Sequence, residues 1–192
     1  MNWSNVDPDI EVPSVSHLLM ATDWIDAIHL ICQSVRRPLV AITCSCRDSL
    51  YAHCRSSPKE IGGLLIGRAF YLPYGVTHGY GFVTCIMDSV PSMEFKNSPV
   101  SLTMETEIWG RVGDYFGKGK MVIGWYHTHP HLGAFFSSVD RSTQAKCFNS
   151  PYCLGVVIDP STGEIRCYCG PNSDEISHPF DVIAEELAFS NP

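Results

Sequence analysis

The amino-acid sequence predicts an α/β (α+β) protein in which short strands and helices follow one another within a single domain. Three observations predict this class. Apolar, β-branched runs bounded by glycine, proline or polar residues are typical of strands. Other segments carry apolar residues at helical spacing. The chain has 192 residues, 45% of them hydrophobic and 17% charged, which is enough for one buried core and an ordinary globular balance.

The first half of the chain contains two predicted helices and three predicted strands. Residues 1–13 form a polar, acidic leader, and residues 14–34 have the apolar spacing of one amphipathic helix, which Pro38 ends. Strands are predicted at 39–43, 60–67 and 81–88, with a short helix at 47–55. The proline- and serine-containing segment 88–99 is expected to be an irregular surface loop.

The second half continues the alternation and contains the most apolar strand. A helix is predicted at 102–116, and the nearly continuous apolar run 121–126 suits a central buried strand. Ser137 or Ser138 is expected to be the N-cap of a helix that continues to Cys147. The last predicted elements are strands at 154–158 and 164–168, joined by a turn, and a terminal helix at 180–189.

Charge and cysteine content exclude several classes of function. The net charge is −7 and no basic stripe is present, which argues against a nucleic-acid partner. No stretch reaches the roughly 18 apolar residues of a membrane span. Nine cysteines without a secretion signal indicate free thiols in a reducing compartment, so we expect a cytoplasmic protein.

The run His127-Thr128-His129-Pro130, followed by Asp140, indicates a catalytic metal site. Two histidines two residues apart place both imidazoles on the same face of an extended strand. A carboxylate eleven positions after the second histidine can return to that face after one turn. Two histidines and one aspartate suit zinc and leave one coordination position open for water, as catalytic zinc sites do.

A zinc hydrolase also needs a group that carries a proton from water to the leaving group. Glu60 is the best candidate, because it stands at the entrance of an apolar, glycine-rich strand. Taken alone, a glutamate at that place is usually an ordinary polar strand end.

These residues together resemble the JAMM (MPN-plus) family of zinc metallo-isopeptidases. The family signature is a distal glutamate and then H-x-H-x(7)-S-x(2)-D, which Glu60, His127, His129, Ser137 and Asp140 match at every position. The resemblance covers roughly residues 38–170. It implies a catalytic domain at 38–170, an N-terminal extension at 1–37 and a C-terminal tail or helix at 171–192.

The resemblance also implies a fold and a reaction. The family fold is a curved mixed β-sheet flanked by helices, the MPN/JAB arrangement with cytidine deaminase-like layering. One Zn²⁺ would be bound by His127, His129 and Asp140, with Glu60 as general base and acid and Ser137 stabilising the oxyanion. Family members cleave after the C-terminal tail of ubiquitin or a ubiquitin-like protein, and the tail adds to a strand edge, for which residues 88–99 are the candidate here.

The segment after the zinc helix, 149–170, is compact where eukaryotic relatives often carry an insertion. This build is similar to the JAMM proteases of bacterial operons that conjugate a ubiquitin-like protein, including antiphage systems. The rival interpretation is a non-catalytic MPN-like scaffold subunit of a larger assembly, which usually lacks the metal ligands. A metallo-β-lactamase-like or amidohydrolase-like enzyme needs further histidine and aspartate ligands, and the sequence offers no such set.

Two other patterns have ordinary explanations that we favour. His131 extends the run to His-x-His-x-His, but it is expected to be a rim or surface residue. The C-x-C pairs Cys44/Cys46 and Cys167/Cys169, on predicted strands, could hold a second zinc only if they met, and buried free thiols are the preferred interpretation. The sequence leaves open a partner protein or a homodimer.

Overall fold

The computed structural model describes residues 39–71, 82–92, 106–116, 119–177 and 180–183. Its elements alternate as predicted. They are β1 (Leu39–Thr43), α3 (Cys44–Cys54), β2 (Gly62–Tyr71), β3 (Phe82–Pro91), α4 (Thr106–Phe116), β4 (Met121–Thr128), α5 (Ser138–Cys147), β5 (Leu154–Asp159), β6 (Glu164–Cys169), β7 (Asp174–Ile176) and β8 (Asp181–Ile183).

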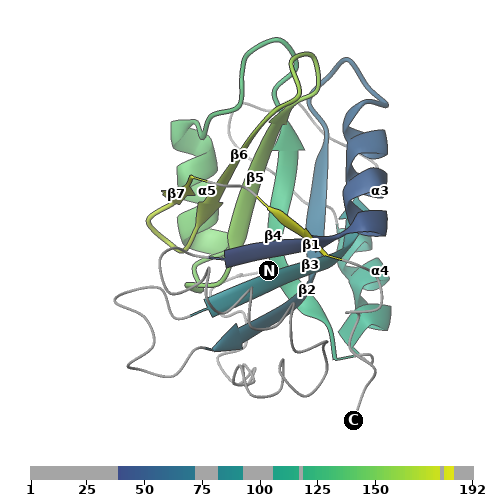
Figure 1. The fold of residues 1–192 in the computed structure, drawn as a ribbon, viewed down its shortest axis with the longest axis vertical. Helices are drawn as coiled ribbons and strands as arrows, with labels where there is room; N and C mark the ends of the chain where they lie inside the picture. The colour runs from purple at the N-terminus through teal and green to yellow at the C-terminus, as the bar shows by residue number, and fades with distance from the viewer. Residues whose placement is uncertain (1–38, 72–81, 93–105, 117–118, 178–179, 184–192) are drawn as a thin grey trace.

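All the described strands belong to one mixed sheet with the order β7-β6-β5-β4-β2-β3-β1-β8. The pairs β4–β5, β1–β3 and β1–β8 are parallel, and the other neighbours are antiparallel. The register of β2 shifts after Leu65 against β4 and after Ile66 against β3, and such irregularities bend a sheet. Figure 1 shows the result, with β1 and β3 running across the direction of β4 and β5. The expected curved mixed sheet with helices is confirmed.

The sheet separates two layers of core, because successive residues of a strand point to opposite faces. Tyr126 packs with Leu50 and Cys54 of α3 on one face. Trp125 packs with Ile108 and Val112 of α4, and with aromatic residues around α5, on the other face. The middle of β4 is buried on both faces, as its apolar run predicts. None of the described helices has the length and apolar character that crossing a membrane requires.

Several element boundaries differ from the sequence prediction. Helix α3 begins at Cys44 rather than at residue 47, because the Thr43 side chain caps it by accepting a hydrogen bond from the Cys46 amide. Cys44 and Cys46 therefore lie in a helix and not on a strand. Strand β3 continues to Pro91, so residues 88–91 pair with β2 instead of forming a loop.

The C-terminal prediction is wrong where it can be compared with the structure. Residues Asp181–Ile183 form β8, which pairs in parallel with β1, although the pattern indicated a helix beginning at residue 180. Pairing with an existing strand edge overrides local preference there. The sheet also gains β7 after residue 170. The predicted helix at 14–34, and residues 184–189, lie outside the described residues.

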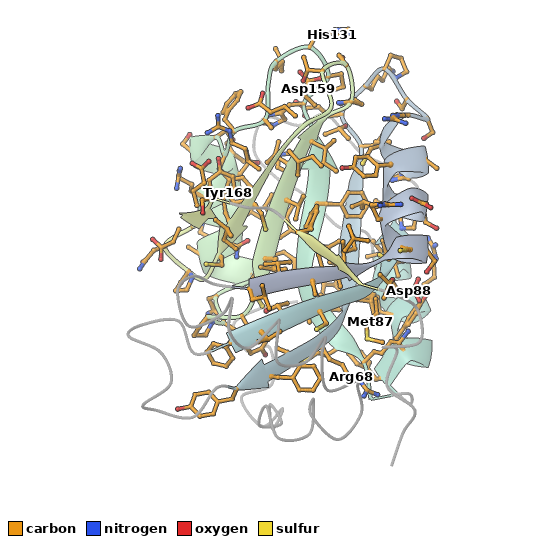
Figure 2. All side chains as sticks on the ribbon, viewed as in Figure 1. Arg68, Met87, Asp88, His131, Asp159 and Tyr168 are labelled. Atoms are coloured by element: carbon orange, nitrogen blue, oxygen red, sulfur yellow. The ribbon has the colours of Figure 1, made fainter. Side chains whose placement is uncertain are left out.

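The two ends of the sheet carry different chemistry. Figure 2 shows His131 and Asp159 together at one end and Arg68 at the other. The end with His131 and Asp159 is where β4 and β5 finish, so the loops that follow them meet there. That end contains the residues of the predicted metal site.

Candidate metal centre

His127 and His129 are fixed at the end of β4 by the strands on both sides. The Thr128 amide donates to the Ile61 carbonyl at 2.8 Å, and the His129 amide donates to the Ile158 carbonyl at 2.9 Å. The chain therefore stays extended through His129, and both imidazoles point to the same face of the sheet. The two side chains are buried.

Asp140 reaches the same place from the first turn of α5. Ser137 is the N-cap of this helix, as predicted, and the two residues form a capping box. The Ser137 amide donates to Asp140 Oδ2 at 2.7 Å, and the Asp140 amide donates to Ser137 Oγ at 3.2 Å. The bonds that begin the helix thus also orient the aspartate toward the histidines.

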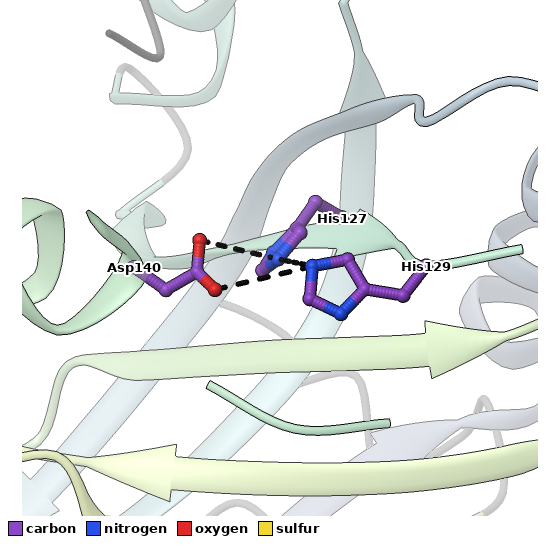
Figure 3. Close-up of side chains that lie close together, drawn as sticks. All are labelled: His127, His129 and Asp140. Atoms are coloured by element: carbon purple, nitrogen blue, oxygen red, sulfur yellow. Dashed lines mark hydrogen bonds and ion pairs between the residues drawn. The ribbon is translucent and has the colours of Figure 1, made fainter. Parts of the chain in front are cut away.

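The three side chains converge closely enough to hold one metal ion (Figure 3). Nε2 of His127 lies 3.1 Å from Nε2 of His129 and 3.3 Å from Asp140 Oδ1, and His129 Nε2 lies 3.9 Å from Asp140 Oδ2. In a tetrahedral zinc site with bonds of about 2.0–2.1 Å, neighbouring ligand atoms are about 3.3 Å apart. Two imidazoles and a carboxylate at these separations therefore fit zinc.

The electrostatics favour the protonation states that a metal needs. Burial lowers the pKa of His129, and the neighbouring His127 lowers it further. Burial alone would raise the pKa of Asp140, but its hydrogen bonds and charge interaction with His127, and its bonds with Ser137, hold the pKa below the usual value. A neutral imidazole and an ionised carboxylate are the metal-binding forms.

The cluster contains no other candidate ligand from the described part of the chain. His131 is exposed and stands outside it. Its backbone has a φ of 65°, and its amide donates to Asp159. The two C-x-C pairs do not meet in a metal-binding group among the described residues, and their cysteines are free thiols.

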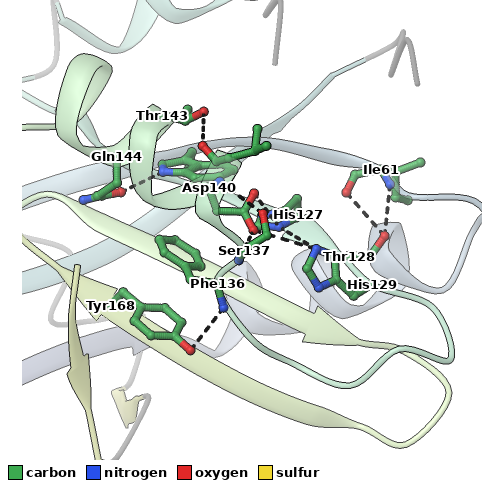
Figure 4. Close-up of polar contacts among 12 residues, drawn as sticks. Ile61, His127, Thr128, His129, Phe136, Ser137, Asp140, Thr143, Gln144 and Tyr168 are labelled. Carbon is green, nitrogen blue, oxygen red and sulfur yellow. Dashed lines mark hydrogen bonds and ion pairs between the residues drawn. The ribbon is translucent and has the colours of Figure 1, made fainter. Parts of the chain in front are cut away.

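Glu60 lies one residue before the point where the start of β2 is tied to the end of β4. The Ile61 amide donates to Thr128 Oγ1 at 3.0 Å, and the Ile61 carbonyl accepts the Thr128 amide (Figure 4). The Glu60 side chain is half-buried, and its charge acts to raise the pKa of His129. Glu60 is therefore beside the cluster but outside the group of three ligands.

The Ser137 hydroxyl has both acceptor and donor capacity at the cluster. Its oxygen accepts the Asp140 amide, its O–H is a donor that the Asp140 carboxylate can accept, and the side chain is only half-buried. A hydroxyl donor beside a metal cluster can stabilise negative charge that develops on a substrate oxygen.

Asp159 holds the loop between the histidines and α5. Its carboxylate accepts hydrogen bonds from the backbone amides of His131, Gly133 and Ser161 at 3.2, 3.0 and 2.8 Å. Burial would raise the pKa of Asp159, but these amides outweigh it and lower the pKa to about 2. From the sequence, Asp159 is predicted only to lie in the turn between the strands at 154–158 and 164–168.

Two residues that lie behind the candidate metal ligands, Trp125 and Gln144, were also not identified from the sequence as part of the site. The indole of Trp125 stacks on the imidazole of His127, and Gln144 accepts a hydrogen bond from Trp125 Nε1 at 2.8 Å. Gln144 follows Asp140 by four residues on α5, and that spacing places both on one helix face. This spacing is the signal that could have found Gln144.

A match to a family model shows which protein family the chain belongs to. Residues 45–168 match the family described as prokaryotic homologs of the JAB domain, and the chain belongs to that family. The resemblance to JAMM (MPN-plus) proteins is confirmed at this level. The matched residues include all five of the signature, from Glu60 to Asp140.

Curated relatives match over part of their length. The chain is 47% identical over 116 residues to the 26S proteasome regulatory subunit rpn11 of Schizosaccharomyces pombe, covering 54% of this chain and 32% of the relative. It is 48% identical over 46 residues to the ubiquitin carboxyl-terminal hydrolase RPN11 of Saccharomyces cerevisiae, covering 23% and 15%. It is 41% identical over 102 residues to the NAD(+) hydrolase TcpA of a Theionarchaea archaeon, covering 53% and 27%.

The chain thus matches no more than about a third of these relatives' lengths. Among solved structures, a protein of Desulfitobacterium hafniense has a similar fold, with a TM-score of 0.54 and 21% sequence identity. That similarity covers 77% of this chain and 94% of the other.

Proposed function

We propose that this protein is a zinc-dependent isopeptidase or peptidase that cleaves after the C-terminal tail of ubiquitin or a ubiquitin-like protein. The convergence of His127, His129 and Asp140, with a serine donor and a glutamate beside them, carries the proposal. Membership of the JAB family and the name of the Saccharomyces cerevisiae relative support it. The free thiols of the described cysteines support a cytoplasmic location.

Each residue of the proposed site has a separate role in hydrolysis. A zinc ion held by His127, His129 and Asp140 would supply Lewis acidity and a lowered pKa for water. Glu60 takes a proton from the attacking water and delivers it to the leaving amine. The Ser137 hydroxyl donates a hydrogen bond to the oxyanion of the tetrahedral intermediate.

The substrate tail has a strand edge available near this site. Among the described residues, Asp88–Pro91 of β3 pair only with β2, because the pairing with β1 is confined to Val83–Ile86. Pro91 lies opposite Gly63, and Gly62 lies opposite His127, so this part of β3 leads toward the cluster. An extended tail can add to such an edge through backbone hydrogen bonds.

The surroundings of the cluster suit a protein substrate. Leu132, Phe135 and Val139 are exposed apolar side chains on the loop and the first helical turn beside it. The Phe135 ring centre lies 4.9 Å from that of His129. Grouped apolar side chains at a surface are typical of sites that contact other proteins. The compact segment after α5 leads us to include the modifiers of bacterial conjugation and antiphage operons among the substrates.

The test is cleavage of a panel of fusions, each with a reporter protein joined after the tail of ubiquitin or a ubiquitin-like protein. Cleavage at the tail that stops with a zinc chelator, and returns with added Zn²⁺, is the expected result. Glu60→Gln is the matched control, because it keeps the shape of the side chain and removes the base. It should bind zinc and fail to cleave.

Three results would count against the proposal. A Glu60→Gln protein with wild-type activity would remove the assigned mechanism. Purified protein that binds no zinc and cleaves nothing would favour the scaffold alternative. Consumption of NAD⁺ in the same panel would connect this region to the activity named for TcpA instead.

A further inference from the structure

The imidazole of His127 lacks the usual device that fixes the orientation of a metal-binding histidine. Such a histidine normally donates its second ring N–H to a carbonyl or carboxylate. Nδ1 of His127 is buried and has no hydrogen-bond partner among the described residues. The polar contacts of His127 are thus all at Nε2, with Asp140 and His129, and ring contacts support the rest of the imidazole.

The strongest ring contact of His127 is with Trp125, two residues earlier on the same face of β4. The two rings are 4.7 Å apart and only 8° from parallel. The other rings near His127 are tilted or edge-on, namely His129 at 75° and Phe136 at 39°. The plane of the indole therefore sets the plane of the imidazole.

Gln144 in turn fixes the indole. It is fully buried on α5, and its Oε1 accepts the Trp125 Nε1–H at 2.8 Å. Its Nε2 carries two hydrogens, which are shared among the carbonyls of Phe148, Cys153 and Gly170 at 3.1, 3.1 and 3.3 Å. Both ends of the amide are engaged, so the amide cannot rotate without breaking these bonds.

The backbone of β5 packs closely against this amide. A Cβ added at Gly155 would overlap the Phe136 ring and lie 2.9 Å from Gln144 Oε1, so only glycine fits there. The Phe136 ring is in turn stacked on Tyr168 at 4.1 Å. The amide therefore lies in a tightly packed part of the core.

We infer that Gln144 is a positioning residue for the metal centre, which acts through the Trp125 indole to fix the ring plane of His127. The inference rests on the proposed metal centre, but it concerns zinc affinity and not cleavage. It gives α5 two links to one site, since Asp140 supplies a ligand and Gln144 orients a second one.

The test compares the zinc dissociation constants of full-length variants, measured by competition with a chromophoric chelator. Gln144→Met keeps the length of the side chain and removes every hydrogen bond of the amide. Trp125→Phe keeps a ring against His127 and removes the N–H. We expect each change to weaken zinc binding by about tenfold or more, as changes behind metal ligands do.

Two controls separate positioning from general loss of stability. Leu50→Ala opens a cavity in the opposite core layer and should lower the melting temperature without changing zinc affinity at temperatures where the protein is folded. The double variant Trp125→Phe/Gln144→Met should bind zinc no more weakly than the weaker single variant, because the residues act in series. Cobalt(II) absorption spectra should show a changed ligand geometry in the same variants only.

The inference is overturned if Gln144→Met, still folded, keeps wild-type zinc affinity. It is equally overturned if Leu50→Ala weakens zinc binding as much, or if the effects of the two single variants multiply in the double variant. A wild-type protein that binds no zinc would instead refute the proposed function.

Discussion

Two histidine environments on opposite faces of β4 show how a histidine paired with a tyrosine differs from one in a candidate metal centre. His53 of α3 accepts or donates one hydrogen bond with the Tyr126 hydroxyl at 2.8 Å, and the two rings meet edge to face. His127, the next residue after Tyr126, instead directs its Nε2 at another imidazole and a carboxylate. His53 and Tyr126 form a hydrogen bond with each other. The group around His127 instead brings the lone pairs of several side chains close together, as a metal site does.

The comparison teaches that burial alone does not identify a ligand. Burial lowers the pKa of both His53 and His129. The difference is that ligand atoms of three side chains, His127, His129 and Asp140, lie within 4.8 Å of one another. Such a group of lone-pair donors can bind one cation. Changes on the two faces of β4 should therefore have very different consequences.

The largest effect is expected from Asp140→Asn. The amide still accepts the Ser137 N–H and keeps the helix cap, but it removes the negative charge from the cluster. Zinc binding should be lost while the melting temperature of the zinc-free protein changes little. Metal analysis of the purified variant is the measurement, and stoichiometric zinc would contradict the assigned ligand set.

Ser137→Gly should impair the reaction and spare the metal. Glycine is a tolerable N-cap that costs only a few tenths of a kcal/mol, but it has no hydroxyl to donate. We expect the rate of cleavage to fall by about 10²–10³, the range for loss of one oxyanion donor, with zinc content unchanged. Ser137→Thr is the control that should retain most of the activity.

Asp159 should make the free energy of unfolding depend on pH in the acidic range. Because its folded pKa is lowered to about 2, its contribution is complete above the unfolded value of about 3.9 and is lost as the pH falls through about 2. Asp159→Asn should therefore be destabilised at pH 7 and show a smaller further loss between pH 5 and 2 than the wild type. Chemical denaturation at several pH values measures this, and parallel curves would disprove the assignment.

The smallest effect is expected from Tyr126→Phe, although residue 126 adjoins a metal ligand. The change removes the hydrogen bonds of the phenol, with His53 and Ser89, and should cost about 1 kcal/mol of unfolding free energy for each bond lost. Zinc affinity should stay at the wild-type value, because the phenol points to the other face. A large loss of zinc affinity would mean that the faces of β4 are not independent.

The parts of the site that follow from local geometry were predictable from the sequence. The spacing of His127 and His129 fixes a common face on any strand, and the offset of Ser137 and Asp140 is that of a capping box. The buried strand at β4 followed from its apolar run. These features need no knowledge of distant segments.

The parts that depend on distant segments were not predictable. The hydrogen-bond partners of Gln144 come from β4, from the end of α5 and from residues beside β5 and β6. Because these segments are separate in the sequence, no local pattern predicts the contacts. Strand β8 forms by pairing with the free edge of β1. The local sequence of the same residues predicted a helix. The bend of β2 likewise arises from its two neighbours.

The capping box at Ser137 and Asp140 has a consequence for metal exchange. The hydrogen bonds that begin α5 are the ones that aim the aspartate, so the helix and the ligand set form in the same folding event. An ion that enters finds its receptor already built and need not organise a disordered chain. We therefore expect that a chelator can remove the metal, and that the metal can bind again, without unfolding of the protein.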